Sequence, residues 1–165
     1  MKLSREWHSL KEDERSLILS FHQTLPVKIG TLAKALGINI KVATLPDNIS
    51  GEIKETNGSV TIKVNKHDVN ARQRFTLAHE VAHFLLHKHL LNSGITDDVL
   101  YRSSLSDEVE AQANRLAADI LMPLSLIKSA VERHVDKKSE AKWEAVAQEA
   151  EVSTTALKIR LGKKV

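Results

Sequence analysis

The feature that most constrains this 165-residue chain is a helical stretch near its middle that carries two histidines one turn apart. From about Ala71 the apolar residues recur at helical spacing, which predicts a helix over residues 71–87. It contains the run His79-Glu80-Val81-Ala82-His83, and the flanking residues are small or apolar, so the helix is expected to be largely buried. Two buried imidazoles without a partner would cost free energy. The fold must therefore supply a partner for both histidines.

The spacing of His79 and His83 allows both imidazoles to reach one metal ion, because residues i and i+4 lie on one face of a helix. Zinc prefers nitrogen ligands in a tetrahedral arrangement. Glu80 projects beside the ligand positions, where it can hold a water and take its proton, while the metal lowers the pKa of that water towards about 7. The pattern predicts His79 and His83 as zinc ligands and Glu80 as the catalytic base. The alternative is that both histidines lie on a solvated helix face.

A catalytic zinc site with one open position needs a third protein ligand, and the chain contains no cysteine. Carboxylates are available on the next predicted helix, residues 106–122. Glu110 is the predicted third ligand, because it follows His83 at a distance that leaves room for a loop and a reversal; Glu108 is the second choice. Asn114, one turn after Glu110, is expected to orient Glu110 or a histidine.

A rival pair is formed by His83 and His87, which also have the i, i+4 spacing. No glutamate follows the first histidine of this pair. His87 and His89 are therefore interpreted as favourable charges or hydrogen-bond donors near a helix C-terminus.

The strand signals come earlier in the chain. Alternating apolar residues predict a strand over residues 38–42. Asn57-Gly58 accepts positive φ at both centres of a type I′ turn, which predicts a hairpin with Ile53 opposite Ile62. These segments predict a small, mostly antiparallel three-stranded sheet packed with several helices, an α+β fold.

The remaining segments are mostly helical, with a loop and irregular chain over residues 92–104. We expect one domain over residues 1–165, with an N-terminal helix within residues 1–25 and a C-terminal helical segment over residues 136–165. The N-terminal helix is predicted over residues 4–22. Further helices are predicted over residues 27–36 and 124–135, followed by two short helices around Val152-Ser153.

Composition excludes several classes of protein. Without cysteine there can be no disulfide framework, cysteine zinc finger, iron–sulfur cluster or thiol catalysis. A chain that is 42% hydrophobic and 27% charged is typical of a globular protein. No apolar run is long enough to span a membrane and no signal peptide is evident, so a cytoplasmic protein is expected. The net charge of +3 permits nucleic-acid contact without favouring it.

The stretch Arg72-Gln73-Arg74-Phe75-Thr76-Leu77-Ala78-His79-Glu80-Val81-Ala82-His83-Phe84-Leu85-Leu86-His87 resembles the ImmA/IrrE family of metallo-endopeptidases. Further matches occur in order along the chain at Pro26, Leu32-Ala33, Leu36-Gly37-Ile38, Ser50-Gly51, Val64-Asn65, Glu110-Ala111-Gln112-Ala113-Asn114 and Ala117-Ala118-Asp119-Ile120-Leu121-Met122-Pro123. The resemblance covers about residues 26–123, and more loosely residues 152–161.

The resemblance implies a zincin-like fold with a metal site on its central helix. Its ligands would be His79, His83 and Glu110, with Glu80 as the catalytic acid and base. The ligand set suits zinc and is also compatible with manganese. The family implies a zinc-dependent endopeptidase that cuts a regulatory protein: a helix-turn-helix (XRE-type) repressor, often of a prophage or a stress response, or an antitoxin.

An alternative interpretation rests on residues 145–161, which resemble a helix-turn-helix. Val152-Ser153 would begin the second helix, although Glu151 stands where glycine is usual. The protein would then be a DNA-binding or toxin–antitoxin module whose metal is structural. The residues expected to face phosphates are Lys158, Arg160, Lys163 and Lys164.

Overall fold

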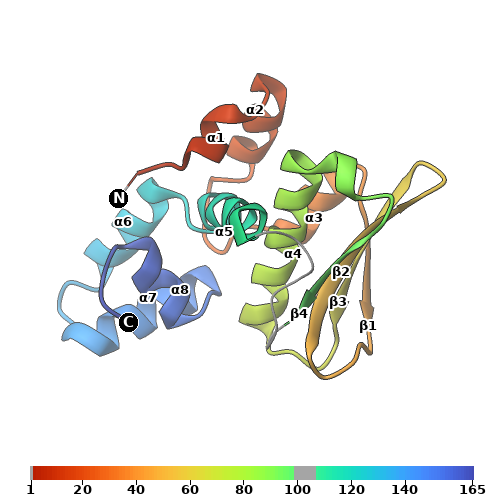
Figure 1. The fold of residues 1–165 in the computed structure, drawn as a ribbon. Helices are drawn as coiled ribbons and strands as arrows, with labels where there is room; N and C mark the ends of the chain where they lie inside the picture. The colour runs from red at the N-terminus through yellow and green to blue at the C-terminus, as the bar shows by residue number, and fades with distance from the viewer. Residues whose placement is uncertain (1, 99–106) are drawn as a thin grey trace.

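The computed structural model describes residues 2–98 and 107–165, which form an α+β fold in which the helices lie on one side of a sheet (Figure 1). The strands are β1 (Asn39–Ala43), β2 (Ile49–Thr56), β3 (Ser59–Asn65) and β4 (Ile95–Asp98). The helices are α1 (Arg5–Ser9), α2 (Glu12–Ser20), α3 (Ile29–Ala35), α4 (Asn70–Leu86), α5 (Asp107–Leu121), α6 (Leu124–Arg133), α7 (Ser139–Ala150) and α8 (Thr154–Arg160), with a 3-10 turn, η1 (Lys88–Leu90).

The sheet corrects the expected topology. Its order is β1-β3-β2-β4, with β1 parallel to β3 and the other pairs antiparallel, so it has four strands and is mixed. Strand β2 follows β1 in the sequence but is not its neighbour in the sheet. The hairpin returns the chain as β3, and β3 lies between β1 and β2. Strand β4 falls within residues 92–104, where a loop was expected, because its few residues show no alternation and are ordered by pairing with β2.

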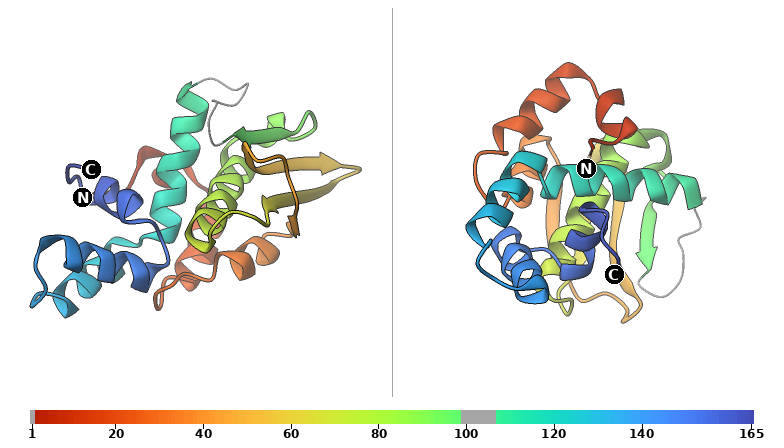
Figure 2. Two further views of the ribbon diagram at one scale, coloured as in Figure 1. Left: turned by 90° about the horizontal axis from the view of Figure 1, so that it is seen from below. Right: turned by 90° about the vertical axis from the view of Figure 1, so that its left-hand side faces the viewer.

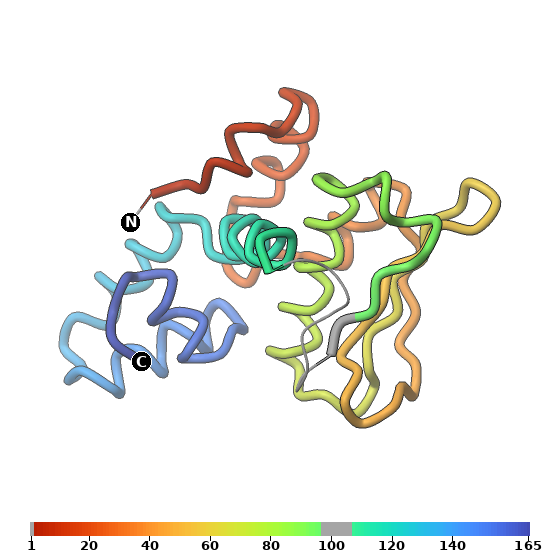
Figure 3. Tube along the Cα trace, viewed as in Figure 1, coloured from red at the N-terminus to blue at the C-terminus, as the bar shows by residue number. Residues whose placement is uncertain are grey.

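The hairpin prediction is confirmed. Asn57 and Gly58 have φ values of 51° and 77°, as a type I′ turn requires. Ile53 lies opposite Ile62, and both side chains are fully buried. Figure 3 shows the turn between β2 and β3 projecting away from the helices.

Helix α4 is held tightly against the sheet at Gly51. A Cβ atom built on Gly51 would lie 2.5 Å from Thr76 Cγ2 and 2.8 Å from the carbonyl oxygen of Lys63. Only glycine permits this approach between β2 and α4. One face of α4 is thereby fixed on the sheet, and α5 crosses its other side (Figure 2).

The N-terminal segment differs from the single helix expected over residues 4–22. The structure has two helices, α1 and α2, because Leu10 and Lys11 adopt extended backbone conformations. Leu10 buries its side chain in the core, and the Arg15 guanidinium donates to the carbonyl oxygens of His8 and Leu10 at 3.1 and 2.7 Å. These contacts replace helical hydrogen bonds at the break.

The C-terminal helices follow the expected pattern. Glu151 ends α7 in the left-handed conformation, with φ of 52°, and the Ser153 side chain accepts a hydrogen bond from the backbone N–H of Ala156 to cap α8. The expected start of α5 at Ser106 lies outside the described residues. Within the part of the chain that is described, no helix has the length and apolar character of a membrane span.

Asp119 connects both ends of the chain to α5. Its buried carboxylate accepts hydrogen bonds from the Ser4 backbone N–H at 3.1 Å and the Ser4 hydroxyl at 2.5 Å. The other carboxylate oxygen lies 2.7 Å from Arg160 Nη1. One side chain therefore anchors the segment before α1 and the end of α8.

Candidate metal centre

The structure brings His79, His83 and Glu110 together where α5 crosses α4. Their ligand atoms all lie within 4.8 Å of one another. Glu110 Oε2 is 3.1 Å from His79 Nε2, and Glu110 Oε1 is 3.3 Å from His83 Nε2. The two Nε2 atoms are 3.1 Å apart. Residues far apart in the sequence thus present two nitrogens and a carboxylate to one point.

The tautomer of His79 is set by Asn114. His79 Nδ1 lies 2.8 Å from Asn114 Oδ1, and an amide oxygen only accepts, so the ring proton is on Nδ1. The neutral ring then has its lone pair on Nε2, toward the other two groups. Asn114 was expected to orient Glu110 or a histidine, and in the structure it contacts His79.

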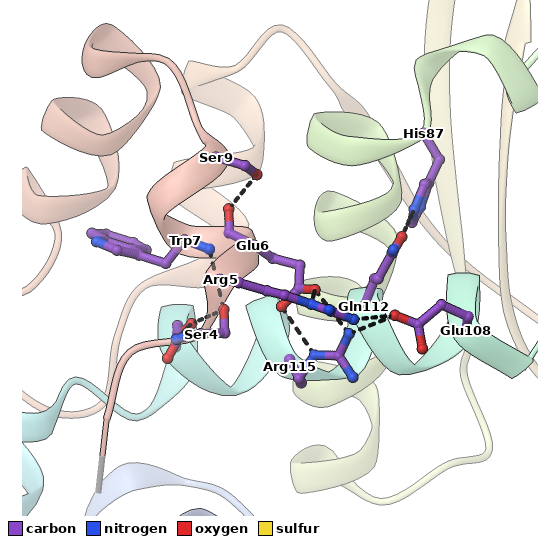
Figure 4. A network of polar contacts seen from close by, with 10 residues as sticks. Ser4, Arg5, Glu6, Trp7, Ser9, His87, Glu108, Gln112 and Arg115 are labelled. Carbon is purple, nitrogen blue, oxygen red and sulfur yellow. Dashed lines mark hydrogen bonds and ion pairs between the residues drawn. The ribbon is translucent and has the colours of Figure 1, made fainter.

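The tautomer of His83 is set by a chain of two side chains that sequence reasoning did not assign to the site. His87 Nε2 lies 2.8 Å from Gln112 Oε1, so the proton of His87 is on Nε2 (Figure 4). His87 Nδ1 then accepts a hydrogen bond from His83 Nδ1–H at 2.9 Å. This leaves the lone pair of His83 on Nε2. The i, i+4 spacing of His83 and His87 was the signal for this contact.

These residues fit a divalent cation. The hydrogen bonds leave lone pairs on two Nε2 atoms, which face each other and the Glu110 carboxylate. These three groups repel one another unless a cation lies between them. Burial lowers the pKa of His83 and keeps its ring neutral. Where no metal is bound, a proton on an imidazole Nε2 can take the place of the cation: burial raises the pKa of Glu110, but the hydrogen bonds from such imidazoles lower it more, so its net pKa is below the ordinary value and the group is anionic. Two imidazoles and a carboxylate are a donor set that suits zinc.

Glu80 lies in the same helical turn and is fully buried. Neither of its carboxylate oxygens has a hydrogen-bond partner among the described residues. A buried carboxylate without a partner is costly, and such groups in native proteins have a functional role or bind water. The position is therefore suited to a carboxylate that works on a water or on a substrate group.

Glu108, the second choice for the third ligand, does not reach the site. Its exposed carboxylate pairs with Arg5 and, at 3.1 Å, with Arg115 (Figure 4). Arg115 also binds the buried Glu6 at 2.8 Å and lowers the Glu6 pKa to about 2. Glu108 thus belongs to the ion pairs that fasten α1 to α5.

Comparison with known proteins identifies two similarities. A family model described as Peptidase_M78, IrrE N-terminal-like domain, matches residues 33–162. Among solved structures, a Mycobacterium tuberculosis transcriptional regulator has a TM-score of 0.58 at 16% identity, covering 96% of this chain and 49% of that one. This chain spans about half the length of that protein, and the likeness shows the fold alone. No curated protein matches the chain.

Proposed function

The chain belongs to the IrrE N-terminal-like domain family of metallopeptidases, Peptidase_M78, and from this premise we propose that it is a zinc-dependent endopeptidase that cuts a regulatory protein. The observation that carries the proposal is the convergence of His79, His83 and Glu110 beside the buried Glu80, whose carboxylate has no hydrogen-bond partner among the described residues. A site that is only structural has no need of a carboxylate without hydrogen-bond partners in the same helical turn.

In this proposal His79, His83 and Glu110 hold the zinc ion. The bound ion would supply Lewis-acid chemistry and a lowered pKa for the attacking water. Glu80 takes a proton from that water as it attacks the peptide carbonyl carbon, and then gives the proton to the amide nitrogen as the C–N bond breaks. Asn114 and the His87–Gln112 pair hold the two imidazoles in the tautomers that this arrangement needs.

The proposed substrate is a helix-turn-helix (XRE-type) repressor or an antitoxin encoded near this protein. It rests on the resemblance to the ImmA/IrrE family. Membership of a peptidase family supports peptide-bond hydrolysis as the reaction class.

The test uses the full chain loaded with zinc and the repressor or antitoxin encoded beside it. We expect the wild type to bind zinc and to cut that protein, and Glu80→Gln to bind zinc without cutting. Glu108→Gln is the matched control, because this carboxylate lies on α5 but outside the site. It should keep both properties. Equal cutting by the wild type and Glu80→Gln, measured by mass spectrometry of the products, would refute the mechanism.

A second candidate function is DNA binding through α7 and α8. The left-handed Glu151 and the Ser153 cap give these helices a turn of the helix-turn-helix kind. Three of the four basic residues expected to face phosphates make contacts within the chain. Lys158 Nζ lies 2.8 Å from Glu140, Arg160 pairs with the buried Asp119, and Lys163 Nζ lies 4.9 Å from the centre of the Trp143 ring. A salt-dependent mobility shift of duplex DNA by the isolated protein would support this candidate.

A further inference from the structure

A groove of about 770 Å³ lies beside the candidate metal centre. Its walls are the first half of α4, the second half of α5 and helix α8, which sit together in the right-hand view of Figure 2. Thr76 and Asn114 line the end of the groove nearest the site. Asn114 holds His79 at 2.8 Å, and Thr76 lies one helical turn before His79 and Glu80. The groove is thus continuous with the residues that hold the site.

Most of the groove's lining is apolar. Phe75 on α4 and Met122 after α5 line it together with Ala71, Ala118 and Ala156. Val69 and Ile159 stand on opposite walls with 72% and 65% of their surface exposed. Large apolar side chains exposed around a hollow are typical of a surface that another molecule covers.

The charged residues that line the groove are all cations: Lys2, Arg72, Arg115 and Arg160. Arg115 and Arg160 are neutralised by carboxylates of Glu6, Glu108 and Asp119. Lys2 and Arg72 have no carboxylate partner among the residues that the structure describes, and the guanidinium of Arg72 has only a contact of 3.5 Å with Ser50 Oγ. The groove therefore has uncompensated positive charge on an apolar surface.

We propose that this groove binds an apolar, acidic segment of the polypeptide that the enzyme cuts. Apolar side chains of the segment pack between Phe75 and Ile159, and a carboxylate of the segment pairs with Arg72. This inference rests on the proposed function, since it treats the metal centre as the place of cutting.

The groove also sets the distance between recognition and cutting. From His79 back to Val69 helix α4 rises about 15 Å, at about 1.5 Å per residue. An extended chain covers that length with roughly four or five residues at about 3.3 Å each. The acidic and apolar positions of the substrate should therefore lie roughly four or five residues from the bond that is cut.

A nucleic acid is the less suitable occupant. Phosphate recognition relies on many free cations, whereas only Lys2 and Arg72 are uncompensated here among the described residues and most of the remaining surface is apolar. Duplex DNA is accordingly one of the probes in the test.

The test measures binding by fluorescence anisotropy, with the zinc-loaded full chain carrying Glu80→Gln so that bound peptide is not cut. The probes are labelled peptides of equal leucine and alanine content that carry Glu, Gln or Lys at the same positions, and a labelled DNA duplex. We expect the Glu peptide to bind roughly 2- to 5-fold more tightly than the Gln peptide, and the Lys peptide to bind most weakly.

Two variants locate the binding in the groove. Arg72→Glu should reverse the preference between the Glu and Lys peptides, and Ile159→Glu should weaken all peptides. Lys41→Glu makes a charge change of the same size at an exposed position of β1 and should leave the preference unchanged.

Equal binding of all peptides, an Arg72→Glu variant that behaves like the wild type, or binding of the duplex alone would overturn the inference. Its failure is distinguishable from that of the proposed function. Loss of cutting in Glu80→Gln, with no effect of Arg72→Glu on binding, would leave the peptidase intact and remove only the docking site. Charge-dependent peptide binding by a protein whose wild type and Glu80→Gln cut equally would instead refute the Glu80 mechanism.

Discussion

His79 and His83 turn the unprotonated nitrogens of their rings toward each other, with the two Nε2 atoms 3.1 Å apart. Asn114 and His87 hold the protons on the opposite side of each ring. The folded chain therefore holds two lone pairs beside the Glu110 carboxylate, and it does so on helices that pack into the core.

Removing the metal should destabilise the protein. A ligand that binds only the folded state stabilises it by about 3–4 kcal/mol when present at 100 to 1,000 times its Kd. For a chain of this size that corresponds to a rise in Tm of about 6–15 °C. Differential scanning calorimetry with zinc and with a chelator measures the difference. The rise in Tm on adding zinc should be mostly lost in Glu110→Gln. Equal Tm values for the wild type with zinc and with the chelator would contradict a metal site.

The His87–Gln112 pair should control zinc affinity although neither residue is a proposed ligand. In His87→Ala, His83 Nδ1 loses its acceptor, and the tautomer with a free Nε2 is no longer favoured. We expect zinc affinity to fall about 10-fold or more, measured by competition with a chromogenic chelator. Gln112→Leu should also lower zinc affinity. His89→Ala, at an exposed position of η1, is the control. Unchanged affinity in both variants would show that His83 needs no such support.

Two glycine substitutions should have different effects on stability. Gly51→Ala places a Cβ atom 2.5 Å from Thr76 Cγ2 and should destabilise the fold by about 1–3 kcal/mol. Gly30→Ala, in α3, meets nothing within 4 Å and should stabilise the fold by about 0.5–1 kcal/mol. Urea denaturation measures both. Equal tolerance of the two changes would mean that β2 and α4 are less tightly packed than the structure shows.

Glu6→Gln should lower stability in a manner that depends on pH. The Arg115 guanidinium lowers the Glu6 pKa from 4.5 to about 2, so the carboxylate stabilises the fold above its ordinary pKa. That contribution is lost as the pH falls through 4.5 toward 2. We expect a loss of roughly 1–2 kcal/mol at neutral pH, because Arg115 is partly exposed and solvent screens the pair. The two proteins should converge near the lower pH, whereas Glu12→Gln, at an exposed position, should follow the wild type at every pH.

The features that the sequence predicted correctly are those with local causes. Asn57-Gly58 permits a turn that few other dipeptides adopt, so it places Ile53 opposite Ile62 without help from the rest of the chain. The i, i+4 spacing of His79 and His83 likewise brings two imidazoles together on any helix. Glu110 could be chosen by the resemblance and by its distance from His83 along the chain, which leaves room for a loop and a reversal.

The features that were missed depend on partners far away in the sequence. Strand β4 has no periodic pattern and exists because β2 offers it a free edge. The break between α1 and α2 arises from the packing of Leu10 and the hydrogen bonds of Arg15. His87 has the spacing of a ligand, but its role follows from Gln112 on another helix, which no property of α4 indicates.

The position of α8 as one wall of the groove has a consequence for synthesis on the ribosome. A nascent chain that has emerged through α5 already contains both histidines, the glutamate and the whole sheet, so the metal centre can assemble early. The groove cannot, because α8 is its third wall and emerges after every ligand. A newly made molecule would thus be able to take up an ion before the third wall of its groove is in place, so the metal centre and the groove are completed in a fixed order.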